Sequence, residues 1–195
     1  MAGKPLSAVD PDLYPAGVPD GAGSPAVAWS AVVAGTVAAI ALTLTLLALG
    51  SAFSLAAVSP WPGVGAKPTT FTIGAGIWLI ITQWLSAALG GYLAGRLRVR
   101  WHGLHTDEVF FRDTAHGFLT WAMATVLMAI VAVVAAALSN VPPPPVDALA
   151  TRETIDAARK AAATFAGFTG LSLVIGAFIG SVSGAIGGRL RDRHP

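Results

Sequence analysis

The sequence predicts an all-α membrane protein whose four transmembrane helices form a duplicated helical hairpin, with both termini in the cytoplasm. Of its 195 residues, 54% are apolar and only 11% are charged, whereas soluble chains average about 25% charged residues. The charges lie between four long uncharged stretches, and one segment occurs twice with related sequence. These observations exclude an ordinary soluble enzyme fold. The chain has no cysteine, which also excludes disulfides, thiolate metal sites and cysteine nucleophiles.

Each uncharged stretch is long enough to cross a bilayer, whose hydrocarbon core takes about 20 residues of helix. The predicted spans are residues 26–58, 69–95, 117–138 and 164–188. Helices are favoured over strands because the apolar runs do not alternate with polar residues, as the strands of a membrane barrel must. We therefore expect one transmembrane domain over residues 26–190.

The two ends of the chain are expected to be tails. Residues 1–25 have Pro, Gly and Asp spread through them and no apolar stretch typical of a cleavable signal peptide. Such a composition buries too little apolar surface to offset the entropy of an unfolded chain. We therefore expect residues 1–25 to form a flexible cytoplasmic tail, and residues 191–195 to form a short C-terminal tail.

The distribution of Lys and Arg predicts the orientation. Eight of the twelve lie in the two tails and the middle loop, and four lie in the other two loops. Because loops rich in Lys and Arg stay in the cytoplasm, both termini are expected there. The arginines near helix ends are expected to fix this topology and contact lipid headgroups: Arg96, Arg98, Arg100, Arg189, Arg191 and Arg193.

The loop after the third span predicts a further helix. Four consecutive prolines at 142–145 end the span, because proline lacks the amide proton that a helix needs. The Ala-rich residues 147–163 then predict an extramembrane helix that runs on into the fourth span. Asp147 is its expected N-cap, and Asp156 has the i,i+4 spacing for ion pairs with Arg152 and Lys160. This helix is either a soluble extension or a docking surface for a partner.

An internal repeat supports the duplicated hairpin. Residues 88–100 (ALGGYLAGRLRVR) align without gaps on residues 181–193 (SVSGAIGGRLRDR), with six of thirteen positions identical. A duplicated pair of spans keeps its orientation, so the two halves are expected to be related by a pseudo-twofold axis along the membrane normal. The alternative is that two helix ends independently acquired small residues for packing and arginines for topology.

Small residues mark the expected packing faces. The fourth span carries four glycines at i,i+4 spacing, a glycine zipper, and the second span carries a shorter stripe. Helices in lipid associate through close van der Waals contact, which small residues allow. We expect the second and fourth spans to cross closely near the cytoplasmic face; contact with another protomer or protein is the alternative. The stripe residues are Gly176, Gly180, Gly184 and Gly188, with Ala87, Gly91 and Gly95.

The predicted spans contain few side chains that could bind or transport a polar solute. An ionisable residue inside the membrane is the usual sign of a transport site, and the four predicted spans contain none. Gln83, flanked by Thr82 and Ser86, is their most polar point. We expect its amide to form a hydrogen bond between helices, with a pore-lining role as the alternative.

The middle loop is the most polar segment. His102, His105 and Asp107 have side chains that bind zinc, but no fourth ligand stands out, so no metal and no cofactor are expected. Aromatic residues alternate with the charges here, which indicates a loop at the lipid headgroups, and Asp113 or Thr114 is the expected cap of the third span. The isoelectric point near 9.4 indicates anchoring to anionic lipids, not binding to nucleic acid.

Several short segments resemble a family of uncharacterised four-span bacterial inner-membrane proteins, loosely labelled PhnA-like. The segments are GAGIW at 74–78, GGYLAGRL at 90–97, AHGFLTWAMAT at 115–125 and ARKAAA at 158–163. The resemblance implies the fold and the membrane location, and it supplies no catalytic residues. The label suggests phosphonate chemistry, for which the chain has no suitable set of metal ligands.

These observations predict a non-enzymatic protein that acts by helix packing. It is expected to be a scaffold, an accessory subunit of a membrane complex or an envelope-stress component, as a homo-oligomer or within a larger assembly, with membrane lipids around it. The alternative is a small channel or transporter for an uncharged or weakly polar solute, with a path near Gln83, Thr82 and Trp84. A third, weaker possibility is an enzyme or metal sensor built on His102, His105 and Asp107.

Overall fold

The computed structural model describes residues 25–57, 65, 67–101, 105–139 and 151–193. These residues form the helices α1 (Trp29–Ala57), α2 (Pro68–Leu97), α3 (Thr106–Leu138) and α4 (Arg152–Arg193). All four are long and apolar enough to cross a membrane. The prediction of an all-helical protein with four such segments is therefore confirmed. Of the two predicted tails, residues 1–24 and 194–195 lie outside the described residues, residue 25 precedes α1, and residues 191–193 are the last residues of α4.

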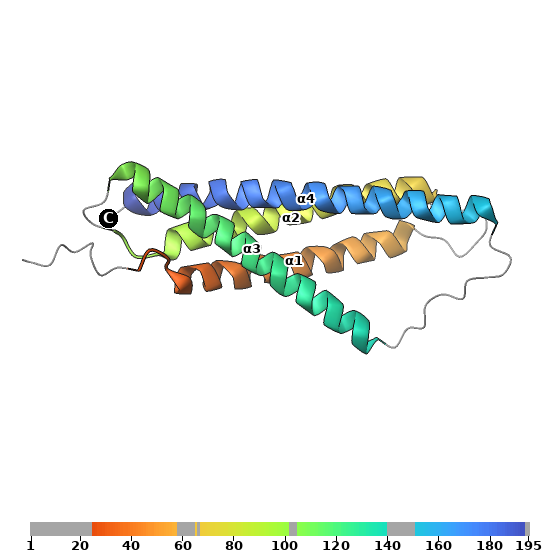
Figure 1. The fold of residues 1–195 in the computed structure, drawn as a ribbon, viewed down its shortest axis with the longest axis horizontal. Helices are drawn as coiled ribbons and strands as arrows, with labels where there is room; N and C mark the ends of the chain where they lie inside the picture. The colour runs from red at the N-terminus through yellow and green to blue at the C-terminus, as the bar shows by residue number, and fades with distance from the viewer. Residues whose placement is uncertain (1–24, 58–64, 66, 102–104, 140–150, 194–195) are drawn as a thin grey trace, which may run out of the picture.

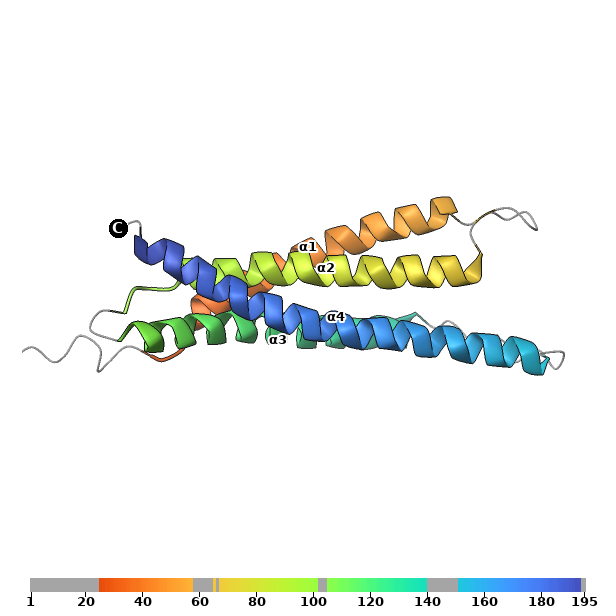
Figure 2. The same cartoon turned by 90° about the horizontal axis from the view of Figure 1, so that it is seen from above.

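The helices form a bundle that is tight at one end and spread at the other (Figure 1). The start of α1, the end of α2, the start of α3 and the end of α4 gather at one end, which we call the closed end. Over their whole length α2 and α4 make the most extensive contact of any helix pair, and they cross near the closed end (Figure 2). At the opposite end, α3 diverges from α4, and its most apolar 18-residue window contains no buried residue. Within a bilayer, this part of α3 therefore faces lipid or another protein.

The hairpin of α1 and α2 is held together by Trp78 along its spread half. The Trp78 indole N–H donates a hydrogen bond to the Leu46 carbonyl oxygen at 2.9 Å. Gly50 of α1 lies directly under this indole, in a place where a Cβ atom would overlap the ring. Phe53 packs edge-on against the same ring, with centroids 5.7 Å apart. The bounds of α1 and α2 lie within three residues of the predicted spans.

The start of α3 differs most from the sequence prediction. The helix begins at Thr106, eleven residues before the predicted start at 117. Two acidic residues, Asp107 and Glu108, lie in its first turn, where a negative charge stabilises the helix dipole. The prediction of Asp113 or Thr114 as the cap is therefore wrong, because both residues lie inside the helix. Thr114 donates its hydroxyl proton to the Phe110 carbonyl oxygen one turn earlier.

The predicted extramembrane helix and fourth span form one continuous helix, α4, of 42 residues. At 1.5 Å per residue α4 is about 63 Å long, roughly twice the thickness of a hydrocarbon core. It begins at Arg152, and the Thr151 hydroxyl accepts a hydrogen bond from the Thr154 N–H at 3.4 Å. The predicted cap, Asp147, lies outside the described residues. Asp156 pairs with Arg159, at 3.4 Å and i,i+3 spacing, in place of the two predicted i,i+4 pairs.

Candidate functional site

An ion pair is buried at the closed end of the bundle. Arg98 follows α2 and Asp113 lies in α3, and the Arg98 Nε donates to a carboxylate oxygen of Asp113. The side chains are 0% and 2% exposed. The Arg98 guanidinium also lies 3.9 Å from the centre of the Trp101 ring, in a cation–π contact. The Asp113 carboxylate lies directly against Gly188 of α4, so this one contact joins three helices.

A buried histidine joins α3 to the start of α1. The His116 Nε2 accepts a hydrogen bond from the Ala28 N–H at 2.7 Å. The other ring nitrogen, Nδ1, therefore carries the proton and donates to the Arg112 carbonyl oxygen at 2.6 Å. Both ring nitrogens are thus used in holding the fold, and His116 is 1% exposed.

Arginine also joins the ends of α2 and α4. The Arg191 Nη1 donates to the carbonyl oxygens of Gly95 and Arg98, both at 3.2 Å, and so caps the last turn of α2. In the opposite direction, the Arg100 side chain donates a hydrogen bond to the Arg191 carbonyl oxygen at 2.7 Å. A positive charge at this position also interacts favourably with the negative end of the α2 dipole.

The prediction that Arg98 contacts lipid headgroups is wrong, because its side chain is fully buried. Arg189 lies over the Phe110 ring, with its guanidinium carbon 4.7 Å from the ring centre. Arg193 is exposed, whereas Arg96 is partly buried and its Nη1 has no hydrogen-bond partner. Headgroup contact by the other arginines stays a prediction.

The glycine stripes of α2 and α4 meet within the chain. Gly91 and Gly95 of α2 lie directly against the carbonyl groups of Gly180 and Gly184, so that a Cβ on either α2 glycine would overlap backbone. Gly117 of α3 lies against the Gly180 carbonyl from the other side. At Gly180 and Gly184, the backbone of α4 is therefore in direct contact with the backbones of both α2 and α3.

The remaining stripe residues have different neighbours. A Cβ at Gly180 would lie 3.8 Å from the Ala87 Cβ, an ordinary van der Waals contact. Gly188 faces the Asp113 carboxylate, as described above, and Gly176 faces the side chains of Gln83 and Trp121. Gly187, which lies outside the predicted stripe, is in direct contact with the Tyr92 carbonyl oxygen.

A cavity of about 420 Å³ lies between the four helices, near the middle of α2. Gln83, the most polar point of the predicted spans, lines it. No charged residue is found among the described residues that line the cavity. Eight of its lining residues carry hydrogen-bonding side chains: Thr43, Thr82, Gln83, Ser86, Trp121, Thr125, Thr169 and Ser172.

The residues considered for a metal site do not come together in the described structure. His105 is exposed and precedes α3, and Asp107 is exposed in the first turn of that helix. His102 lies outside the described residues. Among the residues that the structure describes, no three His, Asp or Glu side chains are grouped closely enough to hold a metal ion.

Sequence reasoning missed Asp113, His116 and Trp121 as partners in the bundle. The first two were visible as ionisable residues just before an apolar run that begins at Gly117. Their i,i+3 spacing places them on one face of a helix. This spacing could have indicated that both face the bundle, if the helix had been predicted to begin near Thr106. Nothing in the sequence alone pairs Trp121 with Gln83.

Comparison with known proteins adds no relative to this description. No family model, no curated protein and no solved structure matches the chain. The resemblance to uncharacterised four-span bacterial proteins therefore stays an expectation from the sequence.

Proposed function

We propose that the protein is a non-enzymatic, multi-pass protein of the bacterial inner membrane that acts by helix packing, as a scaffold or accessory subunit. The observation that carries this proposal is the backbone contact of Gly91 and Gly95 with Gly180 and Gly184. At these glycines α2 and α4 are too close for a substrate to lie between them. The polar groups of the closed end are also directed at one another, since Arg98, Asp113 and His116 each bind another part of the chain.

The distribution of exposed surface supports an accessory role. The last half of α3 contains no buried residue, and large apolar residues there are exposed, including Val126, Val133 and Leu138. In the membrane this surface is available to lipid or to another protein, as a second copy or within a larger complex. The arginine-rich closed end is the cytoplasmic end in this proposal, because positive charges near helix ends stay in the cytoplasm.

Two contacts support the duplicated hairpin as part of this proposal. Residues 93 positions apart approach each other closely at Ala87 with Gly180 and at Gly95 with Gly188, as expected near a pseudo-twofold axis. The helix contacts depart from that symmetry, because α2 packs against α3 whereas α1 and α4 are not in contact within the described residues. In the proposed duplication, the second half has therefore diverged.

The test is to replace Gly180 and Gly184 with Leu, singly and together. We expect each variant to lower the thermal stability of the detergent-solubilised protein and to reduce co-purification of any partner from the native membrane. Gly170→Leu is the matched control, since Gly170 lies on the same helix and a Cβ there meets nothing within 4 Å. Unchanged stability and assembly in the Gly180 and Gly184 variants would contradict the proposal.

A second candidate function is a small channel or transporter for an uncharged solute. The observation that favours it is the presence of hydrogen-bonding side chains, including that of Gln83, in the wall of the cavity. Its test is the uptake of glycerol and urea by proteoliposomes that contain the purified protein. Flux that Gln83→Leu abolishes supports transport, and flux no faster than in protein-free liposomes rejects it for these solutes.

A further inference from the structure

We propose that the central cavity is a binding site for a neutral amphipathic molecule that enters from the lipid. In this site, Gln83 and Trp121 bind the polar head, and an apolar groove between α1 and α2 receives the rest of the molecule. The inference goes beyond the packing function and does not depend on it.

The first observation is a group of buried polar atoms without partners. Thr82 and Ser86 are each 3% exposed, and neither hydroxyl has a hydrogen-bond partner. Other hydroxyls that line the same cavity bind the carbonyl one turn earlier, as Thr43 binds Ala39 at 2.8 Å and Thr169 binds Phe165 at 2.9 Å. Buried polar groups are normally paired, so an unpaired set beside a cavity calls for an explanation.

Trp121 and Gln83 extend this group across the cavity. The Trp121 Nε1 is buried and has no acceptor, although an indole N–H can only donate. A Cβ at Gly176 would lie 2.7 Å from this nitrogen and 2.6 Å from the Gln83 Nε2. The indole of α3 and the amide of α2 therefore meet over one glycine of α4. Together they offer N–H donors to a single acceptor on a ligand.

The position of the cavity favours an uncharged ligand. Gln83 lies at the middle of the 30-residue helix α2, about 22 Å from either end. No charged side chain is found among the described residues that line the cavity, so a charged ligand would have no counter-ion there. A charge without a partner at this depth is strongly unfavourable, whereas a hydroxyl, ester or amide is satisfied by the available donors.

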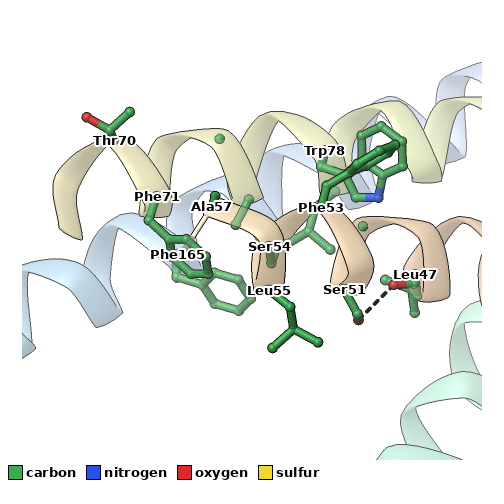
Figure 3. A pocket seen from close by; sticks show the side chains of 14 residues that line it. Leu47, Ser51, Phe53, Ser54, Leu55, Ala57, Thr70, Phe71, Trp78 and Phe165 are labelled. Carbon is green, nitrogen blue, oxygen red and sulfur yellow. Dashed lines mark hydrogen bonds between the residues drawn. The ribbon is translucent and has the colours of Figure 1, made fainter. Parts of the chain in front are cut away.

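An apolar groove lies beside the cavity, mainly between α1 and α2 (Figure 3). The groove has a volume of about 650 Å³ and shares Leu47, Leu79 and Phe165 with the cavity. Its wall includes Phe53 and Leu55, which are 62% and 77% exposed and so face lipid in a membrane. Both volumes fall in the range of about 300–1,000 Å³ that is typical of ligand pockets.

The groove itself offers few polar contacts. Its indole donor, Trp78, is already bound to the Leu46 carbonyl, and its Ser51 hydroxyl donates to Leu47 at 2.9 Å. The groove therefore suits a hydrocarbon chain or ring, whereas the cavity suits a hydrogen-bonding head. Both walls are mostly apolar, and the unpaired hydrogen-bonding groups in the wall of the cavity, on Thr82, Ser86 and Trp121, are the reason for inferring an amphipathic ligand.

The test uses a photoreactive octanol that carries a diazirine, with the full-length protein in phosphatidylcholine nanodiscs. Labelled residues are mapped by peptide mass spectrometry, with and without excess unlabelled octanol. We expect labelling of α2 and α3 around Gln83 and Trp121 that octanol suppresses at least fivefold. Labelling confined to lipid-facing residues, or labelling that octanol does not suppress, would overturn the proposal.

Variants separate binding from folding. Gln83→Leu and Trp121→Phe remove the polar atoms and keep an apolar side chain, and each is expected to reduce the suppressible labelling at least threefold. Gly176→Ala displaces both side chains and is expected to have the same effect, whereas Gly170→Leu leaves labelling unchanged. Each variant is compared at equal helix content and elution volume. Labelling that persists in well-folded Gln83→Leu and Trp121→Phe proteins would reject the assigned head-group contacts. The packing proposal is tested by the separate variants of Gly180 and Gly184. Either of the two proposals can therefore fail while the other holds.

Discussion

Neutralising the buried carboxylate at the closed end should cost far more stability than neutralising an exposed one. Asp113→Asn keeps the size of the side chain but leaves the Arg98 guanidinium without its counter-ion. Removing one partner of a buried ion pair typically costs about 3–5 kcal/mol. The cation–π contact with Trp101 is present in both proteins and does not offset this loss, so we expect a net loss of about 3–5 kcal/mol.

The matched control is Glu108→Gln, which breaks the ion pair between Glu108 and Arg112 on the same helix. That pair joins Nε and Oε1 at 2.7 Å, but its side chains are 22% and 46% exposed. An exposed i,i+4 pair contributes about 0.3–0.5 kcal/mol, so the control is expected to change stability very little. The assay is reversible unfolding in mixed micelles of increasing SDS content, followed by circular dichroism.

A double-mutant cycle separates the pair from general damage. The variants are Asp113→Leu, Arg98→Leu and the double substitution, and the double variant is expected to lose less stability than the two single losses added together. This follows because replacing both charges leaves no buried charge unpaired. Additive losses, or equal losses for Asp113→Asn and Glu108→Gln, would refute the reasoning.

Three further predictions concern contacts away from this pair. Gly95→Leu forces α2 away from α4 and should destabilise the protein by about 1–3 kcal/mol in the same assay. Gly74→Leu should leave stability unchanged, because a Cβ there meets nothing within 4 Å. His116→Phe removes the acceptor of the Ala28 N–H, so hydrogen exchange at the start of α1 should become faster; equal exchange would contradict the contact. Trp78→Phe removes one interhelical hydrogen bond and should cost about 1–2 kcal/mol, and an unchanged unfolding midpoint would show that the bond contributes nothing.

The helices could be predicted from the sequence because lipid restricts spanning segments to long, uncharged helices. The same rule misplaced the start of α3. Hydropathy ends a span at the first charged residue, whereas the helix itself continues to Thr106, where Asp107 and Glu108 stabilise its first turn. A helix can be longer than the part of it that crosses the membrane. In this chain, α3 has more than two helical turns before the predicted span begins.

The closed end could be predicted only in part. The sequence indicates that Arg98 and Asp113 lie near helix ends, but a topology-setting arginine and a buried one have the same local pattern. Their pairing depends on how the loop returns α3 against α2 and on the space that Gly188 leaves. The same holds for the cavity. Gln83 is visible as a polar residue, whereas its meeting with Trp121 depends on three helices packing together.

The most direct test of the central claim, that α2 and α4 pack through their small residues within one chain, is a disulfide between Ala87→Cys and Gly180→Cys. A Cβ at Gly180 would lie 3.8 Å from the Ala87 Cβ, the mean separation across a disulfide. The natural chain has no cysteine, so no other thiol competes. On oxidation in native membranes, we expect an intramolecular bond in the monomer, seen as a reducible shift in mobility. A reducible dimer, or no bond, would contradict this claim.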